Sequence, residues 1–220
     1  MKLIYVERAM VTWLFDTRLI NPKGLDIQQL IDGLKNRFRF AKFPAHSHDL
    51  HDNALVFEAG SFVNSANTAI GANLKTFSDG IVAETQSNTD DTLEFMRQLG
   101  QAILEDGFAL PSEGMEQLGF VSQLRVESET PLLPINPKLA SLARFLEIHL
   151  SSLDGKTRAF EVGGIQLLTE DASKPKAPIP FRFERKYGVP FSQNEYFTQA
   201  PLQTNEHLEL LEELEKILKG

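Results

Sequence analysis

The stretch TAIGANLKTFSDGIVAETQSNTDDTLEFMRQLGQAILE, residues 68–105, decides the fold class. Two strand-like runs, 68–77 and 80–86, are rich in β-branched and apolar side chains. Ser78-Asp79-Gly80 between them predicts a tight hairpin, because an Asp-Gly pair tolerates the positive φ of such turns. A helix is expected over 89–105, since Leu93, Met96, Leu99 and Ile103 repeat at helical spacing. A hairpin followed by a helix indicates an α+β protein rather than alternating β-α-β units.

The same patterns extend outward on both sides of this stretch. Further strands are expected at 3–20, 54–63, 120–127, 158–162, 165–169, 179–186 and 196–198. Further helices are expected from Asp26 to about Asn36, from Asn136 to Asp154, and from Thr204 towards the end of the chain. In the helix after Asn136, the side chains expected to face inward are Leu139, Leu142, Leu146 and Leu150. The chain is therefore predicted to be α+β, mainly antiparallel sheet with about four helices.

Residues 107–119 hold the weakest secondary-structure pattern, with Gly107, Pro111, Gly114 and Gly119 interrupting it. This punctuation favours two α+β subdomains, 1–107 and 108–220, which can share one core. Strands and two helices fall in each half.

Composition bounds the class of protein. Of the 220 residues, 42% are apolar and 24% charged, as in ordinary globular proteins. The absence of cysteine excludes disulfides, thiolate nucleophiles and zinc ribbons. No apolar run reaches the roughly 20 residues of a membrane span, and the first residues do not resemble a signal peptide. A cytoplasmic protein without a membrane partner is expected.

A net charge of −8 disfavours general affinity for nucleic acid. One local exception is the basic and aromatic alternation at 35–43, where Arg37, Arg39 and Lys42 alternate with phenylalanines. Such alternation can serve single-strand binding. The interpretation we favour is structural, with the phenylalanines facing inward and the basic side chains outward.

Three of the five histidines lie within six residues, in the loop His46-Ser47-His48-Asp49-Leu50-His51-Asp52. Imidazole and carboxylate are natural ligands of divalent transition metals. One candidate site is therefore a metal centre built from His46, His48 and His51, with Asp49 or Asp52 as a further ligand. The alternative is a solvated loop whose histidines titrate in the ordinary way.

This loop resembles the His-x-His-x-Asp-His run of the metallo-β-lactamase-like hydrolases. The three histidines fall at the matching positions, whereas Leu50 occupies the position of the aspartate and Asp49 comes one residue early. The resemblance covers six residues and implies a divalent-metal hydrolase. Phosphate-binding glycine loops and the Gly-x-Ser-x-Gly elbow of serine hydrolases are absent from the sequence. His149 is expected at a packing boundary of its helix, and His207 on the surface of the last helix.

Phenylalanine is abundant, with 16 residues against one Trp and three Tyr. Most of these rings are expected in the core, because strands need an apolar face. A partner-binding surface is the alternative for the C-terminal region, through Phe191, Tyr196, Phe197, Leu211, Leu214 and Leu218. The sequence thus predicts a non-enzymatic binding or assembly protein without a cofactor, contacting another protein or further copies of itself. A metal-dependent hydrolase is the alternative.

Overall fold

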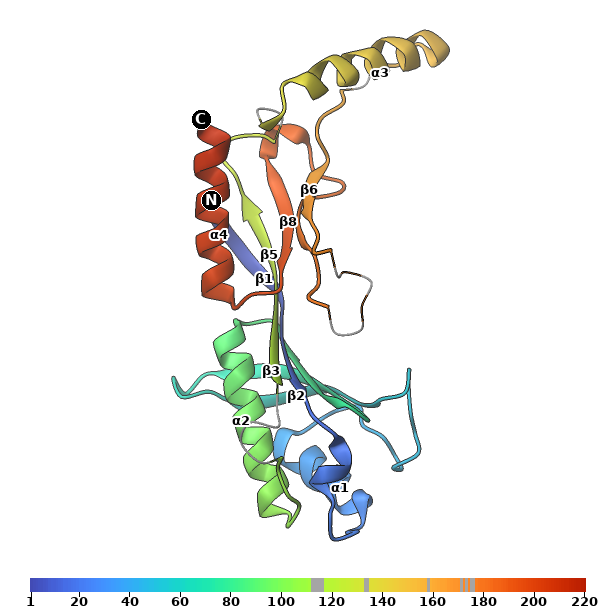
Figure 1. Ribbon diagram of the computed structural model, residues 1–220, viewed down its shortest axis with the longest axis vertical. Helices are drawn as coiled ribbons and strands as arrows, with labels where there is room; N and C mark the ends of the chain where they lie inside the picture. Colours follow the sequence, from blue (N-terminus) through green and yellow to red (C-terminus); the bar gives the residue numbers. More distant parts are fainter. Residues whose placement is uncertain (112–116, 133–134, 158, 171, 173, 175–176) are drawn as a thin grey trace. The chain divides into compact units, whose positions relative to one another are not determined.

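A computed structural model describes residues 1–111, 117–132, 135–157, 159–170, 172, 174 and 177–220. Its strands are β1 (Lys2–Leu14), β2 (Leu55–Val63), β3 (Ala69–Phe77), β4 (Gly80–Thr85), β5 (Gln117–Glu127), β6 (Gly164–Leu167), β7 (Phe181–Arg185) and β8 (Glu195–Ala200). Its helices are α1 (Ile27–Phe38), α2 (Thr89–Glu105), α3 (Lys138–Asp154) and α4 (Thr204–Lys219) (Figure 1). The predicted α+β class, with four helices and an antiparallel sheet among the described residues, is confirmed.

The helices begin where the sequence places their caps. The Asp26 carboxylate accepts a hydrogen bond from the backbone N–H of Gln28 at 2.9 Å. Asn88 Oδ1 accepts one from the N–H of Asp91 at 2.8 Å. Each cap satisfies a backbone donor that the first helical turn would otherwise leave open, which fixes the start of α1 and of α2. At the other end of α2, Gly107 has φ +86°, which suits glycine.

The hairpin between β3 and β4 forms where the sequence predicts it. Phe77 pairs with Gly80, so the loop consists of Ser78 and Asp79. Gly80 is the first residue of β4, and a Cβ there would lie 2.5 Å from the carbonyl oxygen of Trp13. Glycine is needed at this position for close approach of the backbones rather than for the turn itself.

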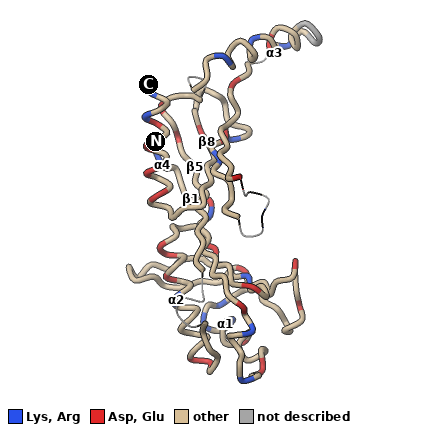
Figure 2. The backbone as a smooth tube through the Cα atoms, viewed as in Figure 1, with Lys and Arg blue, Asp and Glu red and all other residues tan. Residues whose placement is uncertain are grey.

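The described strands follow the hydrogen-bonded order β2-β3-β4-β1-β5-β8-β7-β6. The chain divides into two compact units. Unit 1 comprises residues 1–5, 123–200 and 205–220, and unit 2 comprises 6–122 and 201–204. The boundary expected at 107/108 lies inside unit 2. Lys, Arg, Asp and Glu are interspersed along both units (Figure 2).

The core of unit 2 is built from aromatic rings. Phe95 of α2 contacts Phe38 of α1 with ring centroids 5.0 Å apart, and Phe62 of β2 at 5.2 Å. Phe40 packs against Phe57 at 5.3 Å, and all of these rings are buried. The inward orientation predicted for the phenylalanines near residue 40 is therefore correct.

The core of unit 1 lies between α4 and the sheet. Phe183 of β7 and Tyr196 of β8 stack with ring centroids 4.4 Å apart. His207 of α4 is fully buried, and its Nε2 lies 2.9 Å from Thr198 Oγ1. The expected exposure of His207 is therefore wrong, because the first turn of α4 faces β8 rather than solvent.

The last third of the chain differs from the expected pattern of strands. Residue 158 lies outside the described residues, and 159–162 form no strand, so the strand expected at 158–162 is not seen in the described part. β6 pairs instead with β7, in the register Ile165 opposite Phe183. Residues 133–134 and parts of the loop near 170–176 also lie outside the described residues.

Among the helices that are described, none combines the length and apolar character that crossing a membrane would require.

Candidate functional site

The histidine loop is a compact turn held by its own backbone. The N–H of His46 donates to Asp49 Oδ2 at 2.8 Å. His51 and Ala54 exchange two backbone hydrogen bonds of 2.8 and 2.9 Å, and Asp52 takes φ +51° between them. Asp49 therefore has a local structural role, since its carboxylate accepts a hydrogen bond from the backbone three residues before it.

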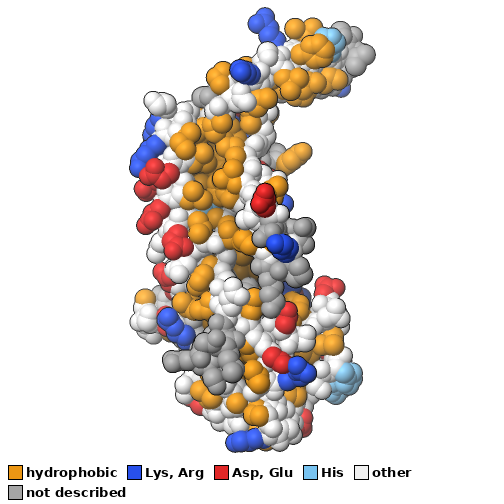
Figure 3. All heavy atoms as spheres, in the orientation of Figure 1, with side chains coloured by type: hydrophobic (Ala, Val, Ile, Leu, Met, Phe, Trp, Pro, Cys, Tyr) orange, Lys and Arg blue, Asp and Glu red, His pale blue; other side chains and the backbone are white. Residues whose placement is uncertain are grey.

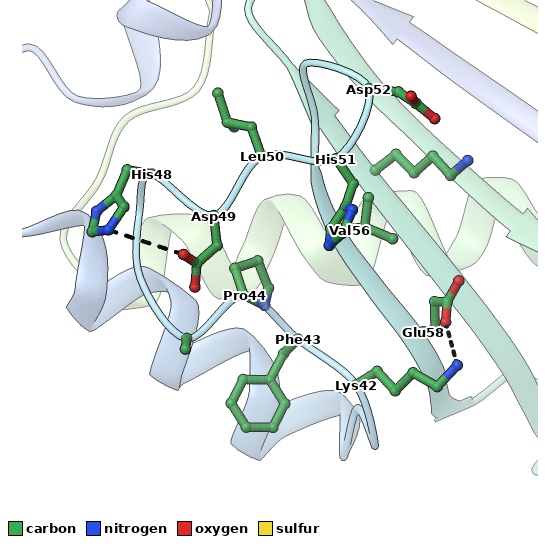
Figure 4. A pocket seen from close by; sticks show the side chains of 12 residues that line it. Lys42, Phe43, Pro44, His48, Asp49, Leu50, His51, Asp52, Val56 and Glu58 are labelled. Atoms are coloured by element: carbon green, nitrogen blue, oxygen red, sulfur yellow. Dashed lines mark hydrogen bonds and ion pairs between the residues drawn. The ribbon is translucent and has the colours of Figure 1, made fainter.

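The rings of the three histidines do not gather at one point. His46 and His48 stack with centroids 5.3 Å apart, and His48 Nε2 lies 4.0 Å from Asp49 Oδ1. Figure 4 shows His51 beside Val56, on the other side of the loop from His48. Across the described ranges, no group of three or more His, Asp or Glu side chains is placed to hold a metal ion. The geometry gives no support to the hydrolase alternative, and elemental analysis of untagged protein is its direct test.

The same loop lines an open pocket of about 880 Å³ that also includes Lys42, Glu58 and Lys75. Lys42 Nζ donates to Glu58 Oε2 at 2.9 Å. This hydrogen bond and the charge of Lys42 lower the pKa of Glu58, and the same bond and the charge of Glu58 raise the pKa of Lys42. Glu58 therefore stays ionised at neutral pH, whereas a general acid must carry a proton there. The pocket thus holds a surface ion pair beside the exposed side chains of His48 and His51.

The basic and aromatic alternation near residue 40 is also accounted for by structure. Arg37 forms an ion pair with Glu105, and the Lys35 ammonium lies 4.1 Å from the ring centre of Phe43. Phe38 and Phe40 are buried. The rings of Phe38 and Phe40 cannot stack on nucleobases while they fill the core of unit 2. The positive charges of Arg37 and Lys42 are compensated by ion pairs with nearby glutamates.

The C-terminal partner candidates fall into two groups. Tyr196, Leu211 and Leu218 are buried, and they stabilise unit 1 by joining α4 to the sheet. Phe197 and Leu214 are half-buried, and Phe191 is 38% exposed. The Phe191 ring lies against the Arg185 guanidinium, 4.8 Å from its Cζ. This region is therefore largely occupied by contacts within unit 1.

Arg185 organises that corner of unit 1. Its Nη2 forms an ion pair with Glu161 and lies 3.3 Å from Asn194 Oδ1. The guanidinium also lies 5.2 Å from the centre of the Tyr196 ring. A charge placed over aromatic rings and paired with a carboxylate holds its neighbours in one geometry. Phe191 is part of this arrangement rather than a free anchor.

A larger apolar surface lies on α3, where the sequence predicted a core helix. Among its residues, Leu142 and Phe145 are each 56% exposed and Ile148 is 59% exposed. We call the exposed set the α3 stripe: Leu139, Leu142, Phe145, Leu146 and Ile148. Figure 3 shows hydrophobic side chains gathered along this helix. The expected inward orientation of Leu139, Leu142 and Leu146 is wrong, because no described part of the chain covers them.

One described contact of α3 is with the segment that follows it in unit 1. Glu147 Oε1 accepts a hydrogen bond from the N–H of Phe160 at 3.1 Å. The Phe145 and His149 rings stack at 3.9 Å, which is a contact within the helix. Gly155, with φ +70°, closes the helix as Asp154-Gly155 predicted. Periodicity identified which residues share a face of α3, but periodicity cannot show what covers that face.

Comparisons with known proteins identify no family for this chain. No protein-family model matches it, and no curated protein matches it. Among solved structures, it is similar to Methanococcus jannaschii TBP, with a TM-score of 0.46 and 9% sequence identity. The match covers 98% of this chain and 97% of that one. A likeness at this level supports no inference about function, which must come from the residues themselves.

Proposed function

We propose that this protein is a non-enzymatic binding or assembly protein that acts through protein–protein contacts made by the α3 stripe. The observation that carries the proposal is the exposure of five large apolar side chains on one helix, each between 38% and 59%. Taking about 200 Å² for a fully exposed side chain of this kind, they present on the order of 500 Å² of apolar surface. The largest apolar patch on a typical monomer is about 300–600 Å² and is often functional.

The shape of the stripe suits a partner. Leu139, Leu142 and Leu146 repeat at the three-and-four spacing of a helix–helix seam, Phe145 lies beside this seam, and Ile148 lies beyond Phe145 on the side of the helix away from Leu139. Aromatic and aliphatic anchors on a regular element are the usual centre of a protein interface. The rest of unit 1 already has its core without α3, so this apolar surface is available for a partner.

Site-specific photo-crosslinking in the cell tests the proposal. A photoreactive phenylalanine analogue at position 145 should give covalent protein adducts after irradiation, because this side chain lies in the stripe. The matched control places the same analogue at Ala140, which is exposed on the polar side of α3 near Arg144 and Glu147. Adducts at 145 that are absent at 140 support the proposal. No adducts at 145, or equal adducts at both positions, would contradict it.

A further inference from the structure

We infer that the partner of the α3 stripe is a second copy of this chain, so that the protein associates into a homodimer through α3. This inference rests on the proposed function and specifies the partner. Three observations carry it: the apolar area of the stripe, the charge of α3, and the spacing of its leucines.

The area of the stripe matches what a homodimer requires. A stable interface buries about 800 Å² on each partner. Homodimer interfaces are about 65% apolar, whereas interfaces between transient partners are about 56–58% apolar. The apolar part of a homodimer interface is therefore on the order of 500 Å² per partner. The five side chains of the stripe expose an area of this size before any flanking polar atoms are counted.

Charge favours self-association at α3 more than on the chain as a whole. The chain carries a net charge of −8, so two copies repel each other in general. The sequence of α3 contains Lys138, Arg144, Glu147 and Asp154, so the helix carries no net charge. None of the five stripe residues is charged. Two copies that approach through α3 therefore meet at a surface with little like-charge repulsion.

The leucine spacing makes the stripe self-complementary. In a two-fold dimer, the same patch serves both copies, so it must pack against itself. Side chains at the three-and-four spacing of Leu139, Leu142 and Leu146 fit the gaps of an identical seam as knobs into holes. The seam is short, so we expect a dissociation constant in the micromolar range rather than a tighter one.

Sedimentation equilibrium of the full chain over a range of about 1–200 µM tests the inference. The average mass should rise with concentration from the monomer value of 24.7 kDa towards twice that value. Phe145→Glu should weaken the dimer at least about a hundredfold, because it places like charges opposite each other in an apolar interface. Ile148→Glu should act in the same way. Ala140→Glu adds the same charge on the polar side of α3 and should behave as the wild type.

Each outcome decides the matter. All of the exchanged side chains are exposed, so circular dichroism should show every variant folded. A wild-type mass that stays at 24.7 kDa throughout, or a dimer that survives both stripe variants, overturns the inference. If the wild type is monomeric but position 145 still crosslinks to a protein of different mass, the proposed function stands and only the second copy is excluded. A monomer without stripe-dependent adducts removes both.

Discussion

A single hydroxyl group connects β8 with α4. Thr198 Oγ1 donates to the carbonyl oxygen of Arg182 at 2.9 Å and lies 2.9 Å from His207 Nε2. Thr198 and His207 are buried and Arg182 is half-buried, so water has little access to replace a lost partner.

Thr198→Val should therefore destabilise the protein by about 1–3 kcal/mol, because a shape-conserving change leaves two buried polar groups without their partner. Denaturant unfolding measures the effect. Thr76→Val in β3 is the matched control, since no hydrogen bond of its hydroxyl is found among the described residues, and it should cost less than about 0.5 kcal/mol. Equal losses for the two variants would show that the hydroxyl of Thr198 contributes little.

Tyr196 gives the protein a specific sensitivity to alkali. Burial raises the pKa of its phenol above the ordinary value of 10.0, and the charge of Arg185 only partly opposes this. The unfolded chain therefore ionises at this residue first, so stability is fully present below about pH 10 and is lost as the pH rises through the folded-state pKa.

The variant Tyr196→Phe removes the ionisable hydroxyl and keeps the ring that stacks on Phe183. Thermal unfolding of the two proteins should differ little near pH 7. The wild type should lose stability relative to the variant as the pH rises past about 10. Parallel pH profiles for the two proteins would show that Tyr196 does not titrate differently on folding.

The role of a single residue could be predicted from the sequence where its partners are near neighbours in the chain. Asp26 and Asn88 cap the helices that follow them, because a cap depends on neighbours two or three residues away. His207 shows the opposite case. Its helical position was clear, but its burial depends on Thr198 and Phe181, which reach it only through the pairing of β7 and β8. The histidine loop lies between these two cases. Its composition could be read from the sequence, but the directions of its imidazole rings could not.

Helices α3 and α4 carry similar leucine patterns in different surroundings. Leu211 and Leu218 of α4 are buried against the sheet, whereas Leu142 and Leu146 of α3 are exposed. A hydrophobic pattern predicts which residues share a face of a helix, but only the tertiary contacts show whether that face is covered. The leucines of α3 were therefore expected to face inward and are exposed, whereas those of α4 were candidates for a partner surface, and two of them, Leu211 and Leu218, are buried.

Leucine-to-alanine changes in the two helices should have unequal effects. Leu211→Ala removes a buried side chain and should cost about 2–5 kcal/mol. Leu146→Ala should change the unfolding free energy by less than about 0.5 kcal/mol, because it leaves no cavity in the monomer. Denaturant unfolding at low micromolar concentration, where self-association is weak, compares them. A large cost for Leu146→Ala would mean that α3 is covered within its own chain.

At the scale of the whole molecule, charge and aromatic burial together argue against nucleic-acid binding. The net charge of −8 opposes phosphate, and the phenylalanines near residue 40 are buried. We expect no binding of a fluorescent single-stranded oligonucleotide, even at low ionic strength, as measured by fluorescence anisotropy. Binding that weakens with salt and is reduced by Arg39→Gln would refute this expectation.

The fold class could be predicted from the sequence, but the division into units could not. Local periodicity and turn residues identified strands such as β3 and β4 and their hairpin. The units depend on which distant strands lie side by side, and β1 and β5 each contribute residues to both units. The boundary was expected from Gly107, Gly114 and Gly119, yet Gly119 lies within β5, and residues 112–116 fall outside the described part.

The discontinuity of unit 1 has a consequence for biosynthesis. Residues 1–5 are synthesised well before the rest of their unit, which resumes only at residue 123. Nearly all of unit 2 emerges in between, as 6–122, and lacks only 201–204. Closing a long loop costs entropy before the contacts that it brings together can form. Residues 1–5 therefore cannot pair within unit 1 while the core of unit 2 forms. Unit 1 is therefore completed only after nearly all of unit 2 has been synthesised, and α3 emerges before residues 205–220 of its own unit.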